Sequence, residues 1–271
     1  VLIANTLGEQ VDQIFALSAD HLGTGVAWLG IIAYSFQIYF DFSGYSDMAI
    51  GIGRMIGFKF PENFNNPYTS QNISEFWRRW HMTLGRWMKD YLYIPLGGSR
   101  VKSKKRLYFN LWVVFLISGL WHGAAWNFVV WGAFHGLFLV LDRLFLIRLL
   151  SRVGKLVSVI FTYFITLIGW VLFRAESWDQ VGYYLKAMCY SDATGASISF
   201  DTQFWFFLMV GAFFSFFAIK DGVEGWQNRI LNDNTSNRNY IFRAIGIILL
   251  IAICVGYITA SGFNPFIYFR F

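Results

Sequence analysis

The sequence predicts an all-α protein that crosses a membrane several times, and three observations support this prediction. Apolar residues make up 56% of the chain and charged residues only 14%, against about 45–50% and about 25% in an ordinary soluble domain. Uncharged stretches are long enough to cross the hydrocarbon core, and the cations gather in short segments between them. We therefore expect residues 1–271 to form a single domain, a multi-span bundle of transmembrane helices.

Five stretches are long enough to consider, because a helix needs about 20 residues, within a range of about 17–25, to cross the hydrocarbon core. Residues 22–40, 156–173, 202–219 and 244–269 each predict a single crossing, the last with Pro265 near its end. Residues 107–141 would form a helix of about 50 Å, which is too long for one crossing. We expect a hairpin there, broken near Gly123, that carries His122.

The distribution of cations predicts which ends of these helices face the cytoplasm. Residues 100–106 carry five positive charges and no acid, and residues 142–155 carry four cations against one acid. Because cytoplasmic loops are enriched in lysine and arginine, both segments are expected on that side, and they explain the net charge of +6 better than nucleic-acid binding does. His122 then lies toward the external leaflet or, in a shallow re-entrant hairpin, near mid-bilayer.

Residues 73–93 are different in kind, because they are too cationic to cross lipid alone. Asn72 followed by Glu75 resembles a capping box, which predicts that a helix begins there. Arginine and lysine side chains are interspersed with tryptophan and phenylalanine along the predicted helix. We expect this helix to be interfacial or buried among other helices.

Two histidines are candidates for chemistry. His122 lies between apolar flanks, and an ionisable side chain at membrane depth is a functional hypothesis by default; the alternative is a histidine bonded to a neighbouring helix. His81 shares a helix face with Trp77 and Met88, a pattern equally typical of a packed position. One histidine can take a hydroxyl proton while a second polar group orients it, so two buried histidines suit acyl transfer. His135 lies on another face and is interpreted as packing.

Other polar residues leave two interpretations open. Asp41 and Asp47 follow the first predicted crossing, and they could line a hydrophilic path or simply pair with cations such as Arg78. Trp121 could form a wall of a cavity beside His122. The sequence contains no phosphate-binding Walker loop, no His-Glu-x-x-His zinc helix and no Gly-x-Ser-x-Gly elbow, and its two cysteines are too few for a cysteine-rich metal site. We expect no metal and no bound cofactor.

Several short segments together carry a resemblance to a known family. They lie at residues 37–51, 60–65 (Phe-Pro-Glu-Asn-Phe-Asn), 75–81 (Glu-Phe-Trp-Arg-Arg-Trp-His), 93–98 (Tyr-Ile-Pro-Leu-Gly-Gly), 119–124 (Gly-Leu-Trp-His-Gly-Ala) and 264–269 (Asn-Pro-Phe-Ile-Tyr-Phe). Because of these segments, the chain resembles the membrane-bound O-acyltransferases, especially members that acetylate exopolysaccharides such as alginate. The resemblance covers the whole chain and implies that N-terminal spans of the family precede it.

The resemblance implies the fold of that family and roles for particular residues. His122 corresponds to the family's essential histidine and His81 to its second motif histidine, while Trp77, Arg78 and Trp121 would shape a substrate tunnel. An acetyl group would pass from a cytoplasmic thioester such as acetyl-CoA to hydroxyls of an extracytoplasmic polysaccharide. The setting implied is the bacterial inner membrane, with multi-pass insertion and with periplasmic or membrane-anchored acetylation proteins as partners.

Three alternatives remain open at this point. The same motifs suit D-alanyl transfer to teichoic acid and the acylation of another cell-envelope polymer. From a different class, a transporter could pass an acyl group or a small anion through the membrane, with the histidines as a proton relay.

Overall fold

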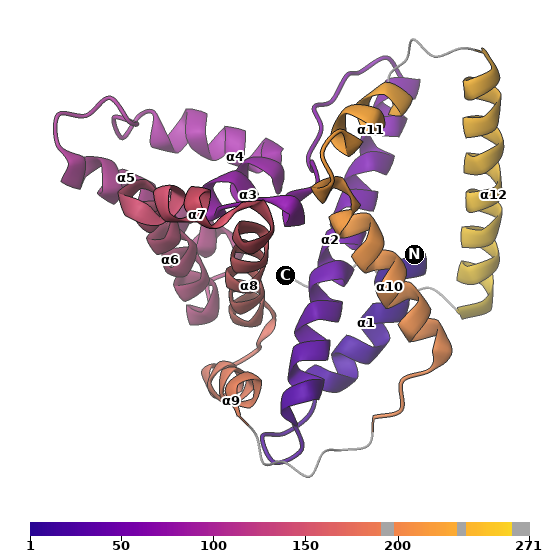
Figure 1. Cartoon of the computed structure of the whole chain (residues 1–271), viewed down its shortest axis with the longest axis horizontal. Coiled ribbons are helices and arrows are strands. Elements are labelled where there is room, and N and C mark those ends of the chain that lie inside the picture. Colours follow the sequence, from indigo (N-terminus) through magenta and orange to yellow (C-terminus); the bar gives the residue numbers. More distant parts are fainter. Residues whose placement is uncertain (191–197, 232–236, 262–271) are drawn as a thin grey trace.

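The structure is a computed structural model, and it describes residues 1–190, 198–231 and 237–261 (Figure 1). Every regular element in these ranges is helical, as predicted. The longer helices are α1 (Leu2–Phe15), α2 (Thr24–Met55), α5 (Lys104–His122), α6 (Trp126–Leu141), α8 (Lys155–Arg174), α9 (Trp178–Cys189), α10 (Thr202–Phe216) and α12 (Asn237–Ser261). Shorter helices are α3 (Ile73–Arg79), α4 (Met82–Met88), α7 (Ile147–Val153) and α11 (Val223–Leu231), with π-helical turns η2 (Lys89–Tyr93) and η3 (Asp142–Leu146).

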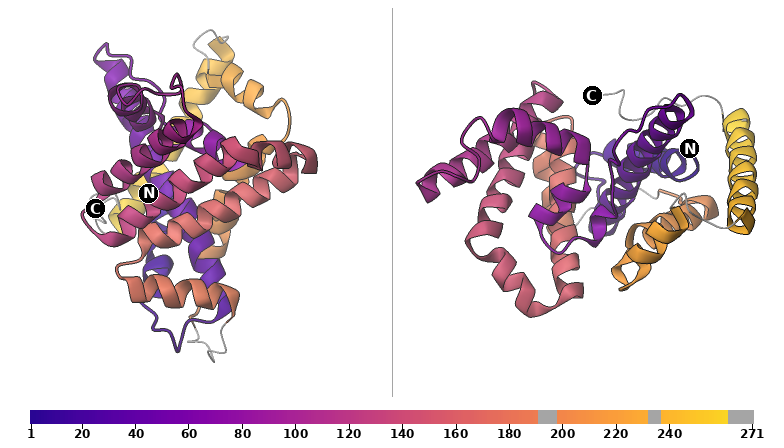
Figure 2. Two further views of the ribbon diagram at one scale, coloured as in Figure 1. Left: turned by 90° about the vertical axis from the view of Figure 1, so that its left-hand side faces the viewer. Right: turned by 90° about the horizontal axis from the view of Figure 1, so that it is seen from above.

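The helices form two groups on either side of α2. Helices α5, α6 and α8 lie together on one side, and α12 stands on the other side beyond α1 and α10 (Figures 1 and 2). The main core joins α1, α2, α8 and α9 through fully buried side chains such as Tyr34, Trp170 and Tyr184. Trp170 lies where this core meets the cluster of α3–α6, so the two groups share one continuous interior.

Three of the predicted crossings coincide with helices that are long and apolar enough to cross a membrane. These are residues Lys155–Arg174, Thr202–Ile219 and Tyr240–Ala260. They confirm that residues 156–173 and 202–219 form helices long and apolar enough for a crossing. The last predicted crossing began at residue 244, and its end, with Pro265, lies outside the described residues.

The predicted hairpin is present, with α5 ending at His122 and α6 beginning at Trp126. Its two helices approach closely because small residues face one another: a Cβ on Gly119 would collide with the carbonyl oxygen of Phe128, and a Cβ on Gly132 with that of Phe115. Close backbone approach at small residues is how helices associate in membranes, where the hydrophobic effect does not drive them together. This close contact between α5 and α6 fixes the position of His122 at the end of α5.

Two predicted elements differ from those in the structure. Helix α2 continues to Met55 instead of ending near residue 40, because no proline interrupts residues 41–55 and the polar side chains Asp41 and Ser46 are buried on it. The single helix predicted for residues 73–93 is broken after Arg79 into α3, α4 and η2. Helices α1, α9 and α11 were not predicted, since each is too short for a crossing.

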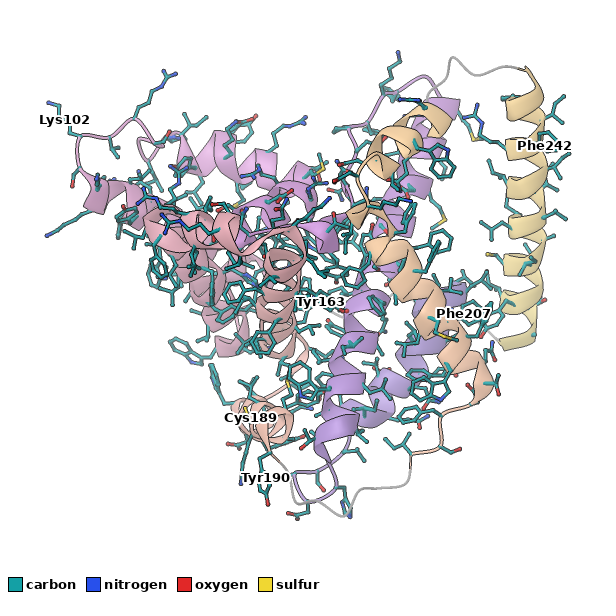
Figure 3. All side chains as sticks on the ribbon, viewed as in Figure 1. Lys102, Tyr163, Cys189, Tyr190, Phe207 and Phe242 are labelled. Carbon is teal, nitrogen blue, oxygen red and sulfur yellow. The ribbon has the colours of Figure 1, made fainter. Side chains whose placement is uncertain are left out.

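The cationic loop before α5 and the end of α9 lie at opposite ends of the molecule (Figure 3). Lys102, in the cationic loop before α5, and Phe242, near the start of α12, lie toward one end, whereas Cys189 and Tyr190 at the end of α9 lie toward the other (Figure 3). The membrane topology predicted from the loop cations requires the loop before α5 and the start of α12 to lie on one side and the end of α9 on the other. Ion pairs secure both ends: Lys155 with Asp221 at 2.5 Å, and Arg174 with Asp12 at 2.8 Å.

The close approach of α5 and α6 generates a stability prediction. Gly119→Ala or Gly132→Ala should lower the free energy of unfolding by about 1–3 kcal/mol, because the added methyl group forces the two backbones apart. The measurement is denaturant unfolding in detergent micelles followed by tryptophan fluorescence. Gly44→Ala is the matched control, since nothing lies within 4 Å of a Cβ at that helical glycine. Equal stability of all three variants would contradict the proposed hairpin contact.

Candidate functional site

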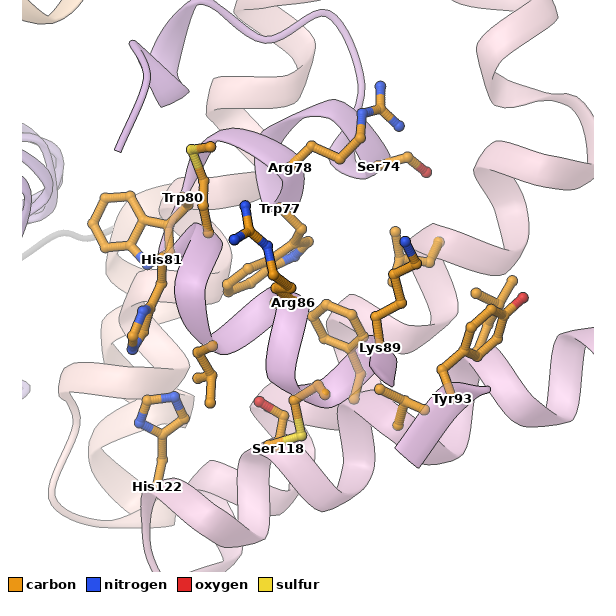
Figure 4. Close-up of a pocket in the computed structure, with 18 of the residues that line it drawn as sticks. Ser74, Trp77, Arg78, Trp80, His81, Arg86, Lys89, Tyr93, Ser118 and His122 are labelled. Carbon is orange, nitrogen blue, oxygen red and sulfur yellow. The ribbon is translucent and has the colours of Figure 1, made fainter. Parts of the chain in front are cut away.

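A cavity of about 520 Å³ lies between α3, α4 and η2 on one side and α5, α6 and α8 on the other (Figure 4). Both candidate histidines line it and lie close together, whereas Lys89 and Tyr93 lie on its other side (Figure 4). The remaining polar and aromatic lining comes from Ser74, Trp77, Arg78, Trp80, Arg86, Phe115, Ser118, Trp131, Arg143, Trp170 and Phe173.

Aromatic rings hold His122 at the break of the hairpin. Helix α5 ends at His122 because Gly123 turns into extended backbone, with φ 170° and ψ 152°. The imidazole lies edge-to-face against Trp131 of α6 and Phe173 of α8, with ring centroids 5.1 and 5.3 Å away. Both of those rings are buried. Three helices therefore fix the orientation of His122 while leaving it on the cavity wall.

His81 occupies a break in the chain that the sequence did not reveal. Its backbone has φ 46° and ψ 52°, the left-handed conformation, which is strained for a residue with a side chain. Two hydrogen bonds to the loop before α3 hold the chain on both sides of it: Met82 N donates to Asn63 O at 2.9 Å, and Asn65 N donates to Arg79 O at 2.9 Å. The reversal turns the imidazole into the cavity toward His122 (Figure 4).

The environment of His81 favours its neutral form. Its ring packs edge-to-face on Phe42, with centroids 4.7 Å apart. Burial and then the nearby His122 lower the pKa of His81 from 6.5 to about 3. At neutral pH the ring therefore carries no charge and keeps one nitrogen lone pair available as an acceptor.

Helix α3 is fixed by contacts at its start and by one arginine at its end. Its N-cap is Asn72, whose side chain accepts from Glu75 N at 2.8 Å, as the capping-box pattern predicted. Ser74 N donates to the buried carboxylate of Asp142 at the end of α6, at 2.7 Å, and burial raises the pKa of that carboxyl. Arg79 points away from the cavity and pairs with both Glu75 and Glu224 at 2.9 Å.

The other residues predicted from sequence fall into two groups. Trp77 and Arg78 line the cavity, as the tunnel hypothesis expects. Trp121 contacts the ring of His122 at 4.9 Å but is 56% exposed and lies outside the lining. Asp41 and Asp47 lie on α2 and are not among the residues that line this cavity, although Ile38, one turn before Asp41, is. Their assignment to a tunnel stays a prediction.

Several site residues were missed from sequence. Trp131 and Phe173 sit in apolar runs whose faces could not be told apart, and Asn63 sits in a loop whose contact with His81 leaves no sequence pattern. The rings of Trp131 and Phe173 pack against His122, and the side chain of Asn63 contacts His81 Nδ1. One available signal was Ser118, which lies four residues before His122 and so on the same face of α5. His135 is fully buried and packs against the rings of Trp77 and Trp131, which agrees with its interpretation as packing.

Four cations give the cavity a charged rim. Arg78, Arg86, Lys89 and Arg143 come from α3, α4, η2 and η3, and all four are exposed as well as lining the cavity. Such a rim attracts an anionic ligand and leaves the apolar interior for an uncharged group. In the described part of the chain no group of three or more histidine, cysteine, aspartate or glutamate side chains could hold a metal ion.

Comparison with known proteins assigns this arrangement to a class. Residues 24–174, which include the whole cavity, match the membrane-bound O-acyltransferase family, and the chain belongs to that family. Together with its candidate membrane spans, this makes it an integral membrane protein.

The relatives act on different polymers, according to their names. The chain is 39% identical over its whole length to the "Probable alginate O-acetylase AlgI" of Azotobacter vinelandii, of which it covers 59%. It is 50% identical, over 69% of its length, to the protein of the same name from Pseudomonas aeruginosa, of which it covers 36%. It is 48% identical, again over 69% of its length, to the peptidoglycan O-acetyltransferase of Helicobacter pylori, of which it covers 36%.

The neutral state of His81 predicts a pH dependence of stability. The unfolded chain takes up a proton on this histidine below pH 6.5, whereas the folded protein does so only near pH 3. Falling pH therefore favours unfolding across that window, by up to about 1.4 kcal/mol per pH unit. Unfolding midpoints at pH 7 and pH 4.5 should differ less in His81→Asn, because asparagine tolerates the left-handed backbone and does not titrate. An unchanged difference would contradict a buried, neutral His81.

Proposed function

We propose that the chain forms the catalytic part of an O-acyltransferase that moves an acetyl group from a thioester to hydroxyl groups of a cell-envelope polysaccharide. The observation that carries the proposal is the meeting of His81 and His122 in one cavity, from segments far apart in the sequence (Figure 4). Neither histidine alone distinguished chemistry from packing. Two imidazoles facing each other in a cavity with an apolar interior and a cationic rim suit acyl transfer.

The reaction can be written with His122 as the general base. An imidazole nitrogen of His122 takes the proton of an acceptor hydroxyl as the oxygen attacks the thioester carbonyl carbon. The tetrahedral intermediate collapses, the carbon–sulfur bond breaks, and the leaving thiolate takes the proton back from the imidazolium. The products are an ester and a free thiol, and His122 returns to its starting state.

The cationic rim supports a phosphate-bearing thioester, such as acetyl-CoA, as the donor substrate. Arginine binds phosphate through charge-assisted hydrogen bonds, and Arg78 and Arg143 lie at the cavity rim. The loops that flank this rim, residues 100–106 and 142–155, are the ones that loop charge assigns to the cytoplasm. The donor would therefore enter from the cytoplasm, and no resident cofactor takes part.

The acceptor would approach from the opposite side, where the hairpin breaks. Trp121 and Trp126 flank this break and are 56% and 72% exposed. The relatives are named for alginate and peptidoglycan acetylation, both of which concern sugar hydroxyls. We infer an extracytoplasmic polysaccharide acceptor, with alginate favoured by the similarity over the full length of the chain, and periplasmic or membrane-anchored acetylation proteins as partners.

The distribution of loop cations also indicates how the helices are arranged in the membrane. We infer a multi-pass bundle in the bacterial inner membrane, in which α2, α8, α10 and α12 each cross once and the α5–α6 hairpin enters from the cytoplasm and returns. The hairpin places His122 between the donor side and the acceptor side. Both substrates can then reach one imidazole without the polysaccharide crossing the membrane.

Replacement of His122 tests this function. His122→Ala in the complete protein should reduce the acetyl content of the exported polymer by about 100-fold or more, which is the contribution expected of a general base. The measurement is ester quantification on purified polymer, with the membrane level of the protein determined in parallel. His21→Ala is the control, because His21 is an exposed loop residue whose ring contacts Ser18 at 3.0 Å. Full acetylation by His122→Ala at a normal protein level would contradict the proposal.

A further inference from the structure

The side chain of Asn63 contacts His81 from behind the cavity. Asn63 is 8% exposed, and its Oδ1 lies 3.1 Å from His81 Nδ1. The same Oδ1 accepts from the backbone N–H of Thr83 at 3.2 Å and from the Thr83 hydroxyl at 2.8 Å. On the far side, Asn63 Nδ2 donates to the hydroxyl of Ser46 on α2 at 3.0 Å. Every polar atom of this amide therefore has a partner.

These contacts decide which nitrogen of His81 carries the hydrogen. A backbone N–H can only donate, so the Asn63 atom that faces Thr83 N must be the oxygen, and the amide orientation is settled. The Thr83 hydroxyl lies 3.5 Å from the same His81 Nδ1, but it gives its hydrogen to Asn63 Oδ1 at 2.8 Å. His81 Nδ1, 3.1 Å from that oxygen, therefore donates to it, which requires a hydrogen on Nδ1. In neutral His81 the lone pair is left on Nε2, the nitrogen on the opposite side of the ring from the Asn63 contact.

We propose that Asn63 is a positioning residue, which holds His81 as the Nδ1–H tautomer so that the Nε2 lone pair faces His122. The proposal rests on the acyl-transfer function proposed above. When His122 takes the acceptor proton it becomes an imidazolium with hydrogens on both nitrogens. The His81 lone pair accepts from the hydrogen that does not come from the substrate, and it stabilises the charge. Ser46, Asn63, His81 and His122 then form one relay from α2 to α5.

The strain at His81 fits this role. A histidine in a left-handed backbone persists only where its surroundings over-determine it, and such residues gather at functional sites. Here Asn63 contributes both its backbone carbonyl, to Met82 N, and its side chain, to His81 and Thr83. One residue thus sets the position of the break and the tautomer of the imidazole within it.

Several groups around His81 bear on how it titrates. His122 of α5 acts on it directly, and the ring that packs on it from α2 is the uncharged Phe42. From α6 and α8 the cavity receives uncharged rings. On the side of Asn63, the acidic groups are Asp47, next to Ser46 on α2, and Glu62, next to Asn63 in the chain. The other charged side chains that line the cavity are Arg78, Arg86, Lys89 and Arg143.

Asn63→Asp in the complete protein tests the relay through the pH profile of acyl transfer. The new carboxylate still accepts from His81 Nδ1, and the Ser46 hydroxyl can rotate to donate to its second oxygen. It also stabilises the imidazolium form and so raises the pKa of His81. Because the relay requires neutral His81, the acidic limb of the kcat/KM profile should move upward by about one pH unit or more, with activity recovering at higher pH.

Asn63→Ala should lower kcat by about 10- to 100-fold with little change in the KM for the donor, because His81 loses its fixed tautomer. Thr83→Val is the matched control: it removes the hydroxyl that donates to Asn63 Oδ1 and lies 3.5 Å from His81 Nδ1, but it leaves the contact between Asn63 and His81. Activity should therefore stay within about threefold of the wild type. Asp47→Asn controls for titration on α2 and should leave the acidic limb in place.

Two outcomes would overturn the relay. One is an acidic limb unmoved in Asn63→Asp, since a position on the pH axis does not depend on how much protein folds. The other is a limb that moves equally in Asp47→Asn. Either result, combined with inactive His122→Ala, would remove Asn63 from the mechanism and leave the acyltransferase function standing. An active His122→Ala would instead overturn the proposed function itself.

Discussion

The reversal of the backbone at His81 is the constraint on which the rest of the site depends. Without it, residues 73–93 would continue as one helix, and the imidazole would stay on the packed face beside Trp77. The loop around Asn63 prevents this by binding the chain on both sides of the break, through Asn63 O to Met82 N and Asn65 N to Arg79 O. The left-handed conformation stores strain that these contacts offset, and the result is an imidazole directed into the cavity.

The hairpin supplies the opposite wall by a different kind of interaction. Gly119 and Gly132 let α5 and α6 approach at backbone distance, and the apposed rings of Trp131 and Phe173 then surround His122. Edge-to-face ring contacts orient a side chain without occupying its nitrogens. This leaves His122 free to exchange a proton, whereas His81 has one nitrogen committed to Asn63. The two histidines are therefore held in different ways that match different roles.

The sequence predicted those elements that depend on local composition. Residues 107–141 form an uncharged run too long for one crossing, so a hairpin broken near Gly123, with His122 at the break, was predicted. Asn72 with Glu75 marked the start of α3 correctly. The break at His81 was not predicted because Trp77, His81 and Met88 have the spacing of a continuous helix. Its cause lies near residue 63, and a contact between separate segments leaves no periodic signal.

The residues that line the cavity also divide into those that local sequence predicted and those that only packing reveals. Trp77 and Arg78 were found because they stand beside a motif histidine. Trp131 and Phe173 lie in runs in which most residues are apolar, so only packing reveals the face they take. Asp41 and Asp47 stood out because charge is rare near a membrane span. The structure places them on α2, outside the lining, since polarity alone does not say which surface a helix presents.

The central claim is that His81 and His122 act on one acyl group, which reaches them through the cationic rim. An experimental structure of the complete protein with a non-hydrolysable thioether analogue of the acetyl donor tests this most directly. We expect the carbonyl of the analogue between the two imidazoles and its phosphates against Arg78 and Arg143. An analogue bound elsewhere, or with its carbonyl out of reach of His122, would contradict the proposed site.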